Sequence, residues 1–194
     1  SFDLTYLCCL PNFIVMAPSS GEELKNMINL ALSINNQPSA IRYPRDLAGD
    51  YSEKKPLQKI KIGKGRIVQN GKKIVFLSLG TRLNQIIDIS KKIEKKYKFI
   101  PSILDMRFAK PIDKKLIKSM IKNHDIFITV EENSIGGFSS QVNNFLINEI
   151  LLTPNILNFF MSDKFIDQSD INDQYYQAGI SEENILKKIA KLLK

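Results

Sequence analysis

Two arginines, Arg42 and Arg45, flank a Tyr-Pro pair in "SAIRYPRD" (residues 39–46), and their guanidinium groups are suited to holding an anion. If residues 39–43 form a strand, Pro44 ends its hydrogen-bonding ladder because proline has no amide hydrogen. Arg45 then lies just past the carboxyl end of the strand, where ligands bind in open α/β sheets. A planar fork of five donors fits a phosphate or a carboxylate. Arg45 is therefore a candidate anion-binding residue, and a surface ion pair is the simpler alternative.

A second string, "VEENSIGGFSS" (residues 130–140), places two carboxylates before a diglycine. Adjacent strand residues point to opposite faces, so Glu131 and Glu132 cannot act together as general acid and base on one substrate. One of them can instead cap the helix that follows. Gly136 and Gly137 would let amides at the start of that helix meet an anion, although a tight strand-to-helix turn is the plainer explanation.

The single histidine, His124, has no evident partners for chemistry. Cys8 and Cys9 are remote from it in sequence, and no acidic residue stands at a spacing typical of a metal site. A Ser-His-Asp set has no support, and the glycine-rich motifs that cradle phosphates are missing. We predict a structural role for His124 and neither a catalytic residue nor a metal ligand in this chain. Four large apolar side chains are expected to belong to the core: Met106, Phe108, Phe159 and Phe160.

The elements that would position Arg45 form a βαβ unit. An apolar run over residues 13–18 predicts a strand, and two serines follow, each with a glutamate three residues later, the spacing of a helix capping box. The helix is expected to bury residues three or four apart: Leu24, Met27, Ile28 and Ala31. Residues 39–43 return as the second strand. About 45 residues cannot bury a sufficient core, so residues 1–45 are expected to be the end of a larger domain.

Residues 46–60 are polar and show no sustained period, which predicts a linker. In residues 61–194 we expect a short strand pair around Asn70-Gly71. Further strands are expected over 74–79, 99–106, 125–132 and 155–161, with helices after Thr81 and over 113–122, 136–150 and 181–194. The helix after Thr81 is expected to bury Leu83, Ile86, Ile87, Ser90 and Ile93. Strands that alternate with helices predict a mostly parallel sheet, covered on both faces.

Charge and composition exclude several classes of protein. The net charge of +8 comes mostly from lysines that alternate with apolar residues, as on solvated faces, and the chain has no Trp. Nucleic-acid binding is therefore not predicted. No apolar run approaches the roughly 18 to 20 residues of a membrane span. The two cysteines are neighbours and unsuited to pairing with each other, which favours a reducing compartment.

Six segments occur in an order and spacing that resemble the 1-deoxy-D-xylulose-5-phosphate synthase family over essentially the whole chain: "FDLTYL", "PNFIVMAPS", "PSAIRYPR", "IGKGRIV", "DMRFAKPID" and "TVEEN..GGF.S.V". Transketolase and the pyruvate dehydrogenase β subunit share the general "VEE...GG" plan. The resemblance implies that residues 1–45 are the βαβ remnant of a pyrimidine-binding domain and that 46–60 are the linker. Residues 61–194 would be a three-layer α/β transketolase C-terminal domain with a mostly parallel sheet.

The resemblance also implies an activity for the full-length enzyme. The family condenses pyruvate with glyceraldehyde 3-phosphate, releasing CO2 and forming 1-deoxy-D-xylulose 5-phosphate for isoprenoid synthesis, with thiamine diphosphate and Mg2+ as cofactors. The family's cofactor ligands and active-site histidine lie upstream of Phe2. We therefore expect an inactive fragment that binds no cofactor by itself. Its expected partners are the missing N-terminal part and a second copy in a homodimer, in a plastid-type organelle or a bacterial cytoplasm.

One substrate residue carries over by resemblance. The second arginine of "RYPR", Arg45, would hold the phosphate of glyceraldehyde 3-phosphate. Two departures bear on that site, because the family usually has Arg at the position of Cys8 and Gly at the position of Asp46. An acidic neighbour opposes a phosphate by about 1 to 4 kcal/mol at about 4 Å, depending on the effective dielectric. The alternative is a stand-alone α/β module that binds an anion or supports dimerisation.

Overall fold

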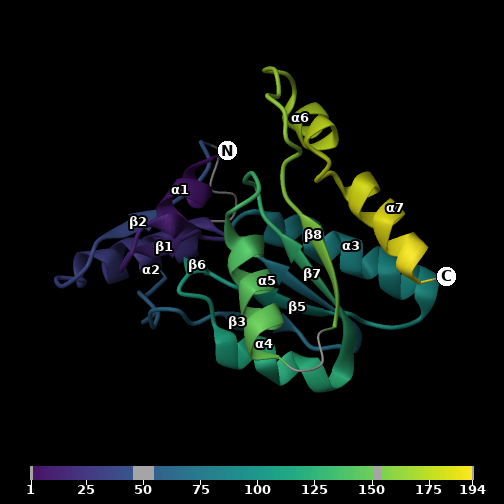
Figure 1. Ribbon diagram of the computed structural model, residues 1–194, viewed down its shortest axis with the longest axis horizontal. Coiled ribbons are helices and arrows are strands. Elements are labelled where there is room, and N and C mark those ends of the chain that lie inside the picture. The colour runs from purple at the N-terminus through teal and green to yellow at the C-terminus, as the bar shows by residue number, and fades with distance from the viewer. Residues whose placement is uncertain (1, 46–54, 151–153, 194) are drawn as a thin grey trace.

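A computed structural model of the chain describes residues 2–45, 55–150 and 154–193 (Figure 1). The strands of this part form two sheets, one of three strands in the order β2-β1-β6 and one of five in the order β3-β5-β4-β7-β8. The smaller sheet and its helices lie at one end of the molecule, and the larger sheet with its helices fills the rest (Figure 1).

The first segment has the predicted βαβ arrangement, preceded by a short helix that was not predicted. Its elements are α1 (Asp3–Cys9), β1 (Ile14–Met16), α2 (Gly21–Leu32) and β2 (Ser39–Ile41). β1 and β2 pair in parallel, and the Ser20 hydroxyl accepts a hydrogen bond from the Glu23 amide at 3.2 Å. The predicted buried face of α2 is partly wrong, because Ile28 is 46% exposed while Glu23 and Asn26 are buried. These polar residues are buried because Glu23 contacts Arg107 and Asn26 contacts Gln58, both of which lie after residue 54.

β6 (Phe108–Lys110) joins the smaller sheet from the far side of the predicted domain boundary. It pairs antiparallel with β1, and the Ala17 amide donates to the Arg107 carbonyl at 2.9 Å. Arg107 has a φ of +60°, which turns the chain sharply just before β6. Main-chain hydrogen bonds therefore join residues 1–45 to the region after 61.

The larger sheet is mostly parallel, as predicted. Its strands are β3 (Arg66–Gln69), β4 (Lys73–Ser78), β5 (Ser102–Asp105), β7 (His124–Val130) and β8 (Asn155–Phe159). Only β3 runs antiparallel to its neighbour, and that neighbour is β5. The predicted strand pair around Asn70-Gly71 is thus wrong: β4 already pairs with β5 and β7 and has no free edge for β3. At Gly71 the turn packs so closely on the Ile100 carbonyl that a Cβ would clash.

Helices cover both faces of the larger sheet and give three layers. They are α3 (Arg82–Tyr97), α4 (Lys114–Met120), a 3-10 turn (Ile121–Asn123), α5 (Phe138–Glu149), α6 (Ile171–Ala178) and α7 (Glu182–Leu192). Val75 and Leu77 of β4 pack with α4 and α5, whereas Ile74 and Phe76 pack with α3 and α7. α3 buries most of the predicted residues together with Ile89, while Ile87 is half-buried. The predicted three-layer α/β fold is confirmed.

Other predictions about the interior had mixed outcomes. Met106, Phe108 and Phe159 are buried in the core, but Phe160 is only half-buried.

In the part of the chain that the structure describes, none of the helices is long and apolar enough to cross a membrane.

Candidate functional site at the junction of the sheets

The carboxyl ends of the parallel strands in both sheets meet at one junction. Gly80, just after β4, has a φ of +66°, and a Cβ there would lie 3.5 Å from the Cβ of Ala17, just after β1. The chain leaving β7 carries Glu131 and Glu132, and the chain leaving β2 carries Arg42. Because ligands in α/β folds bind at the carboxyl ends of strands, this junction is the candidate site.

Arg45 follows β2 at this end, as predicted, and its residue is exposed. Pro44 separates it from Tyr43, a residue that is 59% exposed. Asp46, the neighbour expected to disturb an anion there, lies outside the described residues. The role of Arg45 as an anion ligand stays a prediction.

A surface ion pair was the alternative for Arg45, but the arginine that forms ion pairs here is Arg42. Arg42 Nη2 lies 3.2 Å from Glu132 Oε1, and its Nε lies 3.4 Å from Asp3 Oδ2. The Arg42 side chain is 16% exposed, and its amide donates to the Met16 carbonyl at 2.8 Å. Arg42 is therefore fixed by main-chain and side-chain contacts together.

Residues of two further elements contact Glu132. The Tyr175 hydroxyl of α6 donates to Oε2 at 3.1 Å, and Arg82 Nε of α3 lies 3.7 Å from the same oxygen. The Arg82 guanidinium stacks on the Tyr175 ring at 3.7 Å from its centroid. Burial raises the pKa of Tyr175 to about 12, so its hydroxyl keeps its proton and acts as a donor at neutral pH.

We refer to five residues as the Glu132 cluster: Asp3, Arg42, Arg82, Glu132 and Tyr175. Sequence reasoning found Arg42 and Glu132 but not their contact, and it missed Tyr175 because α6 itself was not predicted. The only signal was that Arg42 and Glu132 were each predicted near the carboxyl end of a strand, over 39–43 and 125–132.

Glu131 points the other way and caps α5, as one of the two glutamates was predicted to do. Its carboxylate accepts hydrogen bonds from the Phe138 amide at 2.9 Å, the Ser139 amide at 2.7 Å and the Ser139 hydroxyl at 2.7 Å. A Cβ at Gly137 would clash with this carboxylate. Burial raises the pKa of Glu131, although the three donors oppose the shift. The amides that the sequence offered to an external anion are thus already occupied.

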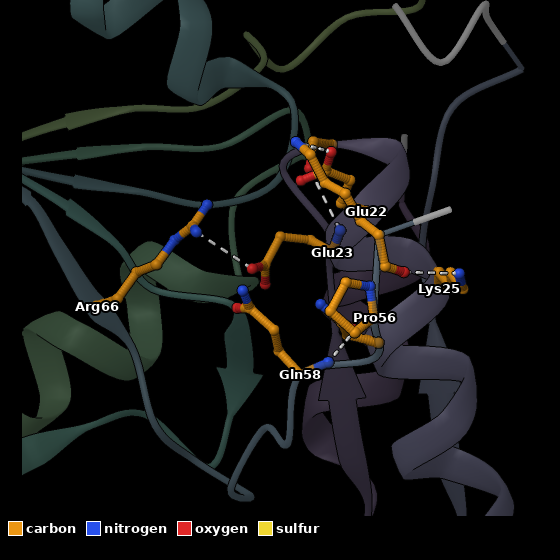
Figure 2. Close-up of a pocket in the computed structure, with 9 residues that line it drawn as sticks. Glu22, Glu23, Lys25, Pro56, Gln58 and Arg66 are labelled. Carbon is orange, nitrogen blue, oxygen red and sulfur yellow. Dashed lines mark hydrogen bonds and ion pairs between the residues drawn. The ribbon is translucent and has the colours of Figure 1, made fainter. Parts of the chain in front are cut away.

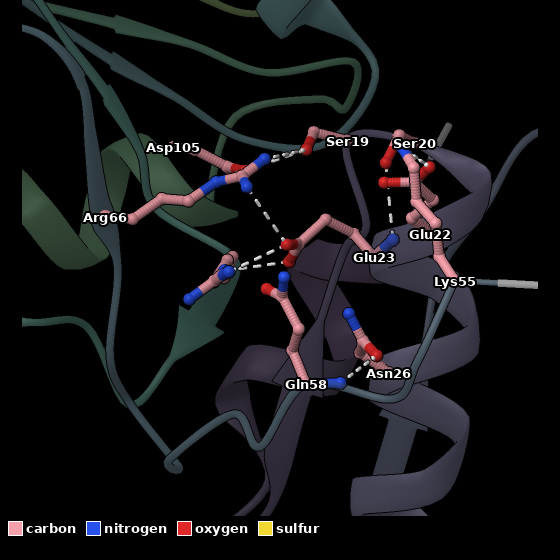
Figure 3. Close-up of polar contacts among 10 residues, drawn as sticks. Ser19, Ser20, Glu22, Glu23, Asn26, Lys55, Gln58, Arg66 and Asp105 are labelled. Atoms are coloured by element: carbon pink, nitrogen blue, oxygen red, sulfur yellow. Dashed lines mark hydrogen bonds and ion pairs between the residues drawn. The ribbon is translucent and has the colours of Figure 1, made fainter. Parts of the chain in front are cut away.

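A second set of charged residues joins α2 to the larger sheet (Figure 3). Arg107 donates to both oxygens of Glu23, from Nε and from Nη2, at 2.7 Å each. Arg66 lies 3.3 Å from Glu23 and 3.0 Å from Asp105, whose carboxylate also accepts from the Ser19 hydroxyl at 2.7 Å. We refer to these five residues as the Glu23 cluster. Sequence reasoning missed it because its partners are up to 86 residues apart.

A polar cavity of about 150 Å³ lies beside the Glu23 cluster (Figure 2). It is lined by α2, by Arg66 and by the segment that includes Pro56 and Gln58. The Gln58 amide donates to Asn26 Oδ1 at 2.9 Å, and Lys55 pairs with Glu22. Both carboxylates that line the cavity are therefore already paired, Glu22 with Lys55 and Glu23 with Arg66.

His124 has the predicted structural role. Its two ring nitrogens lie 2.7 Å from the Met120 carbonyl and 2.9 Å from the Ser102 hydroxyl, and both contacts are buried. Cys8 is buried, which raises the pKa of its thiol to about 12, while Cys9 is exposed. Within the described ranges no group of three His, Cys, Asp or Glu residues is placed to hold a metal ion. Thiamine diphosphate and Mg2+ stay a prediction for the longer protein.

The fold and the strand-end junction define a transketolase-type α/β domain. Residues 63–185 match the family described as "Transketolase, C-terminal domain", and the chain belongs to this family.

Curated relatives narrow the identification. Over 97% of its length the chain is 40% identical to 1-deoxy-D-xylulose-5-phosphate synthase of Proteus mirabilis (strain HI4320). Over its whole length it is 38% identical to the protein of the same name from Blochmanniella floridana. The resemblance found in the sequence is confirmed. The chain spans only 29% and 31% of these two relatives.

Solved structures share the fold. A split-gene transketolase, described as an inactive beta4 tetramer, superposes with a TM-score of 0.82 at 24% identity, over 97% of this chain and 60% of that one. Transketolase from Campylobacter jejuni superposes with a TM-score of 0.69 at 14% identity, over 97% of this chain and 27% of that one. At these identities the likeness concerns the fold alone.

Proposed function

We propose that this chain acts as the C-terminal part of a 1-deoxy-D-xylulose-5-phosphate synthase, in an enzyme that condenses pyruvate with glyceraldehyde 3-phosphate and releases CO2. The observation that supports this most strongly is the extent of the match. Relatives of that name align with 97 to 100% of the chain at 36 to 40% identity, but with only 29 to 31% of their own length.

In this proposal the work is divided between two parts of a longer protein. The N-terminal part, and its copy in a homodimer, hold thiamine diphosphate and Mg2+ and carry out the decarboxylation of pyruvate. This chain supplies the wall of the site at the junction of its two sheets. The isolated chain is therefore proposed to be inactive and to bind no cofactor.

Arg45 is the proposed substrate contact of this chain. It stands at the carboxyl end of β2 and is exposed, so its guanidinium is available to the phosphate of glyceraldehyde 3-phosphate. Arg42 is engaged with Glu132 and Asp3, which leaves Arg45 as the arginine of this segment that can reach a ligand. Pyruvate reacts on the cofactor, away from Arg45.

Calorimetry and a synthase assay test this division. Titrating thiamine diphosphate and Mg2+ into the isolated chain should give no binding, and the chain alone should form no 1-deoxy-D-xylulose 5-phosphate. The full-length enzyme that contains the chain should bind thiamine diphosphate and form 1-deoxy-D-xylulose 5-phosphate. Micromolar cofactor binding by the isolated chain, or a full-length protein without synthase activity, would contradict the proposal.

A further inference from the structure

The segment that carries Arg45 is held by the residue three positions before it. Arg42 is anchored by its amide on Met16, by Nη2 on Glu132 and by Nε on Asp3. Between the anchor and Arg45 lie only Tyr43 and Pro44, and the ring of Pro44 fixes one backbone dihedral. The direction in which Arg45 leaves the sheet therefore depends on the anchoring of Arg42.

Glu132 is the common acceptor in this anchoring. Arg42 comes from the end of β2, Arg82 from the start of α3 and Tyr175 from α6, and each lies within 3.7 Å of a Glu132 oxygen. Its side chain is 17% exposed, and together with Asp3 it balances the charge of the two guanidinium groups in a partly water-excluded place. One carboxylate thus joins the βαβ unit to two helices of the larger sheet.

We propose that Glu132 is a positioning residue, which sets the orientation of Arg45 for the phosphate of the aldehyde substrate by holding Arg42. The proposal rests on the proposed function, because it assigns Glu132 a role in the substrate contact of Arg45. A flexible arginine on an unanchored loop would have to be ordered each time a substrate binds, and misplacement by about 1 Å can lower a rate by about 100-fold.

Glu132 also limits the positive charge that Arg42 and Arg82 add beside Arg45. Without its carboxylate, Arg82 would lose its ion pair with Glu132 and Arg42 would keep only the one with Asp3, so the site would carry an added positive charge that competes with Arg45 for a phosphate. Loss of the carboxylate should therefore weaken selectivity for the phosphorylated aldehyde through both effects. Tyr175 contributes one hydroxyl contact, so its loss should have a smaller effect.

The first test uses the chain itself. Hydrogen exchange at the Arg42 amide, which donates to Met16, should be about 5- to 20-fold faster in Glu132→Gln, while exchange in β4 stays unchanged. Glu149→Gln is the matched control, because it removes an exposed carboxylate that pairs with Lys114 and Lys118 far from Arg42. Arg42→Lys is a second variant, which keeps the positive charge but loses the planar set of guanidinium donors. Unchanged exchange at residue 42 in both cluster variants would overturn the inference.

The second test is a double-mutant cycle in the full-length enzyme. Glu132→Gln should raise the KM for glyceraldehyde 3-phosphate by about 5- to 30-fold, with kcat and the KM for pyruvate within about twofold. Tyr175→Phe, which keeps the ring stacked on Arg82, should raise the same KM by about two- to threefold.

In an Arg45→Ala background the effect of Glu132→Gln on the KM for glyceraldehyde 3-phosphate should fall below about twofold, because both changes would remove the same phosphate contact. Independent, multiplicative effects, or an equal loss with glyceraldehyde that lacks the phosphate, would overturn the inference while leaving the proposed role of Arg45 intact. An Arg45→Ala enzyme that uses the phosphorylated aldehyde normally would instead contradict the proposed function.

Discussion

The Glu23 and Glu132 clusters both join the βαβ unit to the larger sheet through arginines and carboxylates, but their carboxylates differ in exposure. The side chains of Glu23 and Asp105 are 3% and 0% exposed, whereas those of Glu132 and Asp3 are 17% and 24% exposed. A buried ion pair whose partner is removed leaves a charge without water or a counter-ion, while a partly exposed one can be hydrated. The first cluster is therefore suited to fixing the architecture and the second to shaping a site.

The largest expected effect is on the buried cluster. Glu23→Gln should lower the free energy of unfolding by about 3 to 5 kcal/mol, because it leaves the two-point contact of Arg107 without its counter-charge. Urea unfolding followed by circular dichroism measures this. Glu132→Gln should lower the same free energy by only about 1 kcal/mol.

Glu22→Gln serves as a control for the first prediction. Glu22 neighbours Glu23 on α2 but pairs with Lys55 at the surface, so its loss should change the stability by less than about 1 kcal/mol. Equal losses of stability in all three variants would remove the contrast between the two clusters.

A smaller effect is expected at the cap of α5. Glu131→Gln should lower the free energy of unfolding by about 1 to 3 kcal/mol, because one end of the amide would turn a donor toward the amides of Phe138 or Ser139. Thermal unfolding measures the change. A variant as stable as the parent chain would show that the cap does not need an acceptor at both oxygens.

The smallest expected effect concerns the docking of α1 beside the Glu132 cluster. The buried Cys8, with its pKa raised to about 12, should resist a thiol reagent at pH 8, so that one thiol per native chain, the exposed Cys9, reacts rapidly. Asn133 holds α1 through the Leu4 amide at 3.2 Å and the Thr5 hydroxyl at 2.8 Å. Asn133→Ala should therefore speed labelling of Cys8 by about 3- to 10-fold. Two rapidly reacting thiols in the parent chain would contradict this packing of α1.

Local signals in the sequence predicted the elements with strong patterns. The capping serine before α2, the buried run of β4 and the position of Ser181, whose hydroxyl accepts from the Asn184 amide at 3.3 Å, all gave correct elements. The predicted strand pair around Asn70-Gly71 was wrong because a turn signal is local. The order of the strands is set by burial in the whole sheet, where β4 lies between β5 and β7.

The candidate site was only half predictable. The position of Arg45 past a strand end was predicted, and so was a glutamate cap on α5. Arg42 and Glu131 were predicted inside strands over 39–43 and 125–132, but β2 ends at Ile41 and β7 at Val130. The pairing of Arg42 with Glu132 joins residues 90 apart, and Arg107 reaches Glu23 across 84, so neither had a local signature. α6 and the three-residue β6 were missed because elements this short form through tertiary contacts rather than a local pattern.

Kinetics of Arg45 variants in the full-length enzyme test the central claim most directly. Arg45→Ala should reduce kcat/KM for glyceraldehyde 3-phosphate by about 10- to 150-fold, the loss of one charge-assisted contact of about 1.5 to 3 kcal/mol, and should leave the pyruvate half-reaction nearly intact. Arg45→Lys should recover part of the loss, and Asp46→Gly should lower the KM for the aldehyde phosphate alone. An Arg45→Ala enzyme with an unchanged kcat/KM for glyceraldehyde 3-phosphate would contradict the assignment of this strand end to the substrate.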